Sequence, residues 1–108
     1  MIDAAEAVRT QVDRRRAETI GFLQELIRLT PKGEAAVQER VARELKSLGC
    51  EVATLRYRPD DVPMKDEFAA AQAMAHEERA SIVARLRGTG GGRSVIFFAH
   101  PDGEPVKG

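Results

Sequence analysis

The sequence predicts an α/β fold with the element order helix, helix, strand, helix, strand, strand. Apolar residues recur at helical spacing within residues 37–48, and they alternate with polar residues, as in a strand, over residues 50–58 and 81–87. Ser94–Ala99 follows, and its consecutive apolar residues indicate a strand buried on both faces. The chain has 108 residues, which is enough for one modest core.

Two helices are predicted before the first strand. Residues 3–29 lack proline and are expected to form one long helix, whose apolar second half docks while its charged first half projects. The residues expected on the docking face are Ile20, Leu23 and Ile27. The second helix is expected to begin at Thr30-Pro31 and to be capped at its C-terminus by Gly49. Its apolar face consists of Val37, Val41, Leu45 and Leu48.

The remaining predicted elements are three strands and one helix. The segment from Cys50 to Arg58 is typical of an edge strand that is covered on one face. Its covered face is expected to hold Ala53, Leu55 and Tyr57. Residues 64–78 are alanine-rich and predict a helix, and residues 81–87 predict the second strand. The glycine-rich stretch 88–93 then leads into Ser94–Ala99.

Charge and composition argue against several classes of partner. The chain has 17 basic and 17 acidic residues, a formal net charge of +0, so no overall field attracts nucleic acid or an anionic membrane. No apolar run approaches the ~20 residues of a membrane span, and the first residues do not match a signal peptide, so a cytoplasmic protein is expected. Cys50 is the single cysteine, which excludes a disulfide within the chain.

Two side chains able to do chemistry follow the predicted last strand directly. His100 and Asp102 lie past its carboxyl end, where open α/β sheets gather ligands. In a purely structural interpretation His100 bonds locally and Asp102 forms a turn with Gly103. In the other interpretation the imidazole binds a metal ion and the carboxylate accepts from its second ring N–H. The only other histidine, His76, is interpreted as an exposed residue near a helix end.

The order of motifs resembles the start of a metallohydrolase family. These motifs are residues 26–29, the helix end and strand start at 45–52, the strand and glycine-rich stretch at 82–92, and residues 98–102. The family comprises the co-catalytic zinc peptidases and deacylases, which include aminoacylase, acetylornithine deacetylase, succinyl-diaminopimelate desuccinylase, carboxypeptidase G and carnosinase-like dipeptidases. The resemblance runs from about Phe22 onward and implies a zinc-exopeptidase-like mixed sheet flanked by helices.

The resemblance also implies a role for His100 and a role for Asp102. His100 would be a ligand of one of two zinc ions, with cobalt or manganese as alternative metals, and Asp102 would act in catalysis by orienting it. Such a metal pair would lower the pKa of a bridging water to roughly 7. The substrate would be a small peptide or an N-acyl amino acid.

By the same resemblance, residues 1–108 would be the N-terminal portion of a catalytic domain. The other ligands, the general base and a lid or dimerisation domain lie downstream in the family. The chain alone is therefore expected to bind zinc weakly and hydrolyse nothing. A homodimer is possible only for the complete protein. A later strand of the family pairs beside the run Ser94–Ala99, which would be partly unpaired here. The departures include Ser81, where the family has Asn, and an apparent insertion at residues 59–78. Gly103-Glu104 also precede Pro105, where the family commonly has two apolar residues.

Two other functions remain open. The first is a non-catalytic α/β module that uses its incomplete sheet to pair with another protein. The second is a nucleotide-binding module built on the glycine-rich stretch 88–93. That stretch departs from the phosphate-loop pattern, because Arg93 stands where the spacing needs a glycine.

Overall fold

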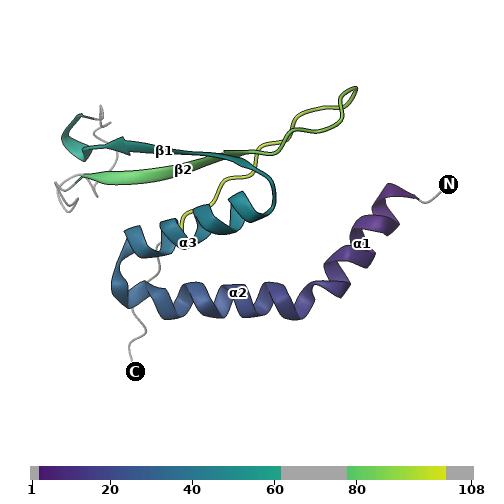
Figure 1. Ribbon diagram of the computed structural model, residues 1–108, viewed down its shortest axis with the longest axis horizontal. Coiled ribbons are helices and arrows are strands. Elements are labelled where there is room, and N and C mark those ends of the chain that lie inside the picture. Colours follow the sequence, from purple (N-terminus) through teal and green to yellow (C-terminus); the bar gives the residue numbers. More distant parts are fainter. Residues whose placement is uncertain (1–2, 62–77, 102–108) are drawn as a thin grey trace, which may run out of the picture.

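The computed structural model describes residues 3–61 and 78–101, which form an α/β arrangement in three layers. Helix α3 lies between helix α2 and a two-stranded antiparallel sheet (Figure 1). The elements are α1 (Ala4–Arg14), α2 (Arg16–Leu29), the 3₁₀ turn η1 (Thr30–Lys32), α3 (Glu34–Ser47), β1 (Glu51–Tyr57), the 3₁₀ turn η2 (Pro59–Asp61) and β2 (Arg79–Arg85). None of the described helices has the length and hydropathy of a membrane span.

The predicted single helix over residues 3–29 is wrong, because it is broken at Arg15. This residue has φ −94° and ψ 8°, which ends α1, and α2 continues in a different direction (Figure 1). Asp3 caps the N-terminus of α1, because its Oδ1 accepts a hydrogen bond from the backbone N–H of Ala5 at 3.1 Å. α1 buries no residue, so tertiary packing does not hold it in line with α2. The prediction that the first half projects is confirmed.

The face by which α2 docks is not the predicted one. The predicted residues Ile20, Leu23 and Ile27 are 47%, 56% and 61% exposed. The half-buried residues of α2 are Phe22, Glu25, Leu26 and Leu29. The reason is that Phe22 and Glu25 both contact Arg40 of α3, which turns their side of α2 toward the neighbouring helix.

The two ends of α3 are set by glycines in left-handed conformations. Gly33, with φ 102°, precedes the helix, so α3 begins later than the predicted Thr30-Pro31, which forms the turn η1. At the other end Gly49 has φ 88°. Its N–H donates to the carbonyl of Lys46 and the N–H of Cys50 donates to that of Leu45, both at 3.0 Å. This pair of bonds is a Schellman motif, and it confirms the predicted glycine cap.

The sheet is covered on one face by α3 and is open on the other. In its register Ala53 lies opposite Val83, and Val52 lies opposite Ala84, so each pair shares a face. Val52 is half-buried, whereas Val83 is 50% exposed. The covered face predicted for β1 is therefore wrong: the predicted side chains Leu55 and Tyr57 are 55% and 37% exposed. β2 begins two residues earlier than predicted, at Arg79.

The apolar run Ser94–Ala99 is not a buried strand. Among the described residues it belongs to no ladder, and β2 pairs with β1 alone. The exposed fractions of its side chains rise from 74% at Val95 to 94% at Phe98. A buried strand needs a neighbour on each side, and the described residues supply none. The predicted helix over residues 64–78 lies outside the described residues, except for Glu78.

Opposite effects are expected when alanine replaces Gly49 and Gly21. At Gly49 the left-handed backbone penalises a Cβ, so Gly49→Ala is expected to lower the free energy of unfolding by about 1–2 kcal/mol. Gly21 lies within α2 with no atom within 4 Å of an added Cβ, so Gly21→Ala is expected to raise it by about 0.5–1 kcal/mol. Urea unfolding of both variants checks this, and an equal shift in the same direction would contradict it.

Candidate functional site

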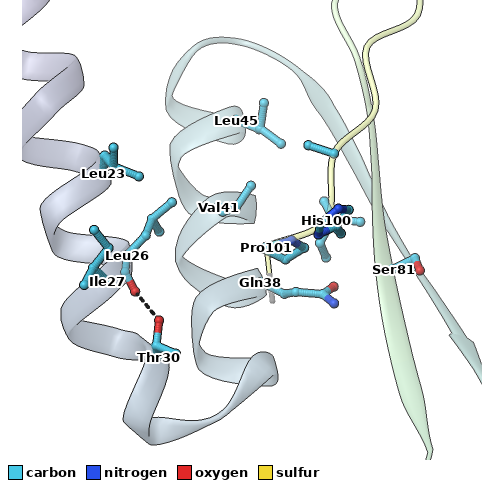
Figure 2. Close-up of a pocket in the computed structure, with 12 residues that line it drawn as sticks. Leu23, Leu26, Ile27, Thr30, Gln38, Val41, Leu45, Ser81, His100 and Pro101 are labelled. Atoms are coloured by element: carbon cyan, nitrogen blue, oxygen red, sulfur yellow. Dashed lines mark hydrogen bonds between the residues drawn. The ribbon is translucent and has the colours of Figure 1, made fainter. Parts of the chain in front are cut away.

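His100 stands at the edge of a cleft between the helices and the sheet. The cleft has a volume of about 550 Å³ and is lined mainly by aliphatic side chains of α2, α3 and β2. Figure 2 shows His100 and Pro101 lying across from Val41 of α3, on the side nearer β2. The imidazole is exposed to solvent at this edge.

A turn after β2 brings His100 back to the helices. Gly90 and Gly91 have φ values of 102° and 78°, which allow the chain to reverse direction. The returning segment runs from this turn to α3 (Figure 1), where residues 99–101 line the cleft. Pro101 also restricts the backbone of His100. The sequence predicts His100 directly after a strand of the sheet. In the structure it is positioned by the turn at Gly90 and Gly91 and by the segment that runs back to α3.

The second half of the predicted His–Asp pair lies outside the described residues. Asp102 and His76 both fall there, so the predicted roles of both residues stay predictions. Within residues 3–61 and 78–101, no three His, Cys, Asp or Glu side chains come together in a way that could hold a metal ion. Catalytic zinc takes three protein ligands and a water. A zinc site that used His100 would therefore need its other ligands from outside these residues.

Arg40 connects the two helices that form one wall of the cleft. Its Nε and Nη2 donate to the two carboxylate oxygens of Glu25 at 2.7 and 3.2 Å, and its Nη1 donates to Glu44 at 2.9 Å. The guanidinium carbon also lies 4.9 Å from the ring centre of Phe22. The hydrogen bond to Glu25 raises the pKa of Arg40, and the same bond lowers that of Glu25. This cluster fixes α2 against α3.

A second polar group joins α3 to the sheet and reaches the cleft. Glu34 accepts a hydrogen bond from Arg79 of β2 at 2.5 Å through Oε2, and one from Nε2 of Gln38 at 3.0 Å through Oε1. Gln38 is 8% exposed and lines the cleft. Its Oε1 has no hydrogen-bond partner among the described residues. Sequence reasoning missed Gln38, although its spacing of four from Glu34 is a recognisable helical pair.

The glycine-rich turn does not have the surroundings of a phosphate site. A phosphate loop holds its anion at the N-terminus of the helix that follows. Residues 93–101 form no helix. Arg87, at the start of the turn, is paired with Glu51 at 3.0 Å. These observations count against the nucleotide-binding alternative.

Comparison with known proteins assigns no family to the chain. No family model matches it, and no curated protein and no solved structure matches it. The resemblance to the co-catalytic zinc hydrolases therefore continues to depend on the motifs in the sequence alone.

The ion pair of Glu25 with Arg40 predicts a specific loss of stability in acid. The pair lowers the pKa of Glu25 in the folded chain below its usual 4.5. The contribution of the pair to the free energy of unfolding is therefore fully present at pH values above 4.5. It is lost as the pH falls through the lowered folded value. The difference in unfolding free energy between the wild type and Glu25→Gln is therefore expected to shrink as the pH is lowered from about 6 toward about 3.

Thermal or urea unfolding across this pH range checks the expectation. The matched control is Glu39→Gln, which changes an exposed glutamate of α3. A difference for Glu25→Gln that is independent of pH, or that shrinks equally in the control, would contradict the role of the pair.

Proposed function

We propose that this chain is the N-terminal portion of a zinc-dependent hydrolase that cleaves amide bonds in small peptides or N-acyl amino acids. In this proposal His100 supplies one zinc ligand and Asp102 orients its imidazole. The zinc ions, or cobalt or manganese in their place, would lower the pKa of a bound water and polarise the amide carbonyl. The proposal draws on the order of motifs that the sequence shares with the co-catalytic zinc hydrolases.

The observation that best supports this proposal is the setting of His100. Its imidazole is exposed at the edge of an apolar cleft, and ligand sites in proteins commonly combine an apolar wall with a few polar groups. Pro101 limits the ways in which the backbone can present the ring. An accessible side chain on a restricted backbone favours metal binding, because ordering a mobile side chain on binding costs conformational entropy.

One ligand does not make a catalytic zinc site. The described residues offer no group of three ligands, so the proposal requires further ligands from outside them. Until these are present, we expect weak zinc binding and no hydrolysis. The residues that complete the site would be the functional partner of this chain.

A second candidate function is favoured by the exposed apolar surface. Val95–Phe98 are largely exposed, and the open face of the sheet adds Leu55 and Val83. Exposed apolar patches of this kind mark surfaces that contact other polypeptides. The alternative is a non-catalytic module that binds another protein through this surface and does not respond to metal.

Zinc titration by calorimetry separates the two functions. It is carried out on the chain alone and on the chain mixed with the polypeptide encoded downstream in the same reading frame. We expect binding to be at least about tenfold tighter in the mixture, an increase that His100→Ala abolishes. His76→Ala is the matched control and should leave binding unchanged.

Equal zinc binding by the wild type and His100→Ala in every mixture would overturn the ligand role of His100. If the mixture also formed a complex without zinc, with an affinity that zinc does not change, the interaction module would be the better account.

A further inference from the structure

Helix α1 extends away from α3 and the sheet, with its apolar side chains exposed (Figure 1). Val8 and Val12 are each 63% exposed, and no residue of α1 is buried. At about 100° per residue, Val8 and Val12 share one stripe of the helix with Ala4 and Ala5. A helix of 11 residues is only marginally stable in water unless an apolar face is packed. The stripe on α1 is such a face, and the described residues leave it uncovered.

The charges along α1 and its two ends change from acidic to basic. Asp3 and Glu6 lie at the start of the helix. The other end is basic, with Arg14, Arg15 and Arg16 in succession. None of these five side chains forms an ion pair within the described part of the chain. A second α1 running in the same direction would bring like charges together, whereas one running in the opposite direction places the acidic start beside the basic end.

The apolar stripe suits the same antiparallel arrangement. Val8 and Val12 lie two residues to either side of Thr10. An antiparallel copy centred at Thr10 therefore sets Val8 of each helix against Val12 of the other. Arg9 and Asp13 flank the stripe on one side, and a two-fold axis brings Arg9 of each helix beside Asp13 of the other. Such a self-complementary contact closes as a dimer and does not continue into a fibre.

We propose that α1 is a dimerisation helix that pairs antiparallel with α1 of a second copy of this chain. Val8 and Val12 of the two copies form the apolar centre of the contact, and Arg9 of each copy pairs with Asp13 of the other. The dimer goes beyond the proposed function, because it uses neither His100 nor a metal, and it requires no downstream domain. The stripe is short, so the dimer is of the weak class that buries less than ~1,200 Å².

Sedimentation equilibrium of the full chain tests the proposal. We expect its average mass to rise reversibly from that of a monomer toward that of a dimer between about 10 µM and about 1 mM. Val8→Gln removes two apolar side chains from each dimer, so the dissociation constant should rise at least about tenfold. Glutamine is also a better helix former than valine, so a loss of helix is not the cause. Thr10→Gln, at an exposed position on the opposite side of α1, is the matched control and should change the constant by less than about twofold.

Charge reversal tests the two ion pairs across the dimer. Arg9→Glu alone, or Asp13→Arg alone, sets like charges against each other, so each change should raise the dissociation constant about threefold or more. A chain that carries both changes should dimerise within about twofold of the wild type, because each pair is then restored with its charges exchanged. Since α1 buries no residue, none of these variants should alter the urea unfolding of the chain.

Disulfide cross-linking on a Cys50→Ala background determines the direction of the two helices. Only an antiparallel pair brings position 8 of one copy within disulfide reach of position 12 of the other. Val8→Cys chains mixed with Val12→Cys chains should therefore form the mixed disulfide about fivefold faster than either variant cross-links with itself.

Three results would overturn the proposal. The first is a wild-type chain that stays monomeric up to about 1 mM. The second is a Val8→Cys variant that cross-links faster with itself than with Val12→Cys, because the helices would then be parallel. The third is a dimer that Val8→Gln leaves unchanged and Phe97→Ser abolishes, which would place the interface on the exposed run Ser94–Ala99 instead.

Discussion

The bidentate ion pair between Arg40 and Glu25 is the interaction on which the rest of the described structure depends. It holds α2 against α3, and α3 in turn covers one face of the sheet. Apolar packing contributes little to this arrangement, because Val37 is the one fully buried apolar side chain of α2, α3 and the two described strands. The second connection is also polar, from Glu34 on α3 to Arg79 on β2. Both walls of the cleft are therefore positioned by charged groups attached to α3.

The sequence predicted the elements whose signals are local. The spacing of apolar residues and Gly49 identified α3 and its C-terminal cap, and the alternation of residues identified β1. The docking face of α2 was missed because it depends on Arg40, which is 15 residues from Glu25. The run Ser94–Ala99 has the composition of a buried strand, but burial needs neighbouring strands that composition cannot supply. For α2 and for Ser94–Ala99, contacts with residues distant in the sequence, and not the local pattern, determine which side chains are buried.

The candidate site was predicted in part. His100 was selected from its position after an apolar run, and the structure brings it to the edge of a cleft with Gln38. The cleft itself could not be read from the sequence, because its walls come from α2, α3, β2 and residues 99–101. Gln38 also lines the cleft and was missed, although its spacing of four from Glu34 is that of a helical pair. Its burial is seen only in the structure, because it depends on the packing of α3 against the sheet.

In the described structure α3 is the fixed element, and the apolar run Ser94–Ala99 has no ladder partner within residues 3–61 and 78–101. Amide hydrogen exchange measured residue by residue tests it most directly. We expect the slowest exchange at Val37 and Val41, and exchange at Ile96, Phe97 and Phe98 within about tenfold of an unstructured peptide. Protection of these three amides equal to that of Ile82 in β2 would contradict it, since it would mean that the run forms a paired strand.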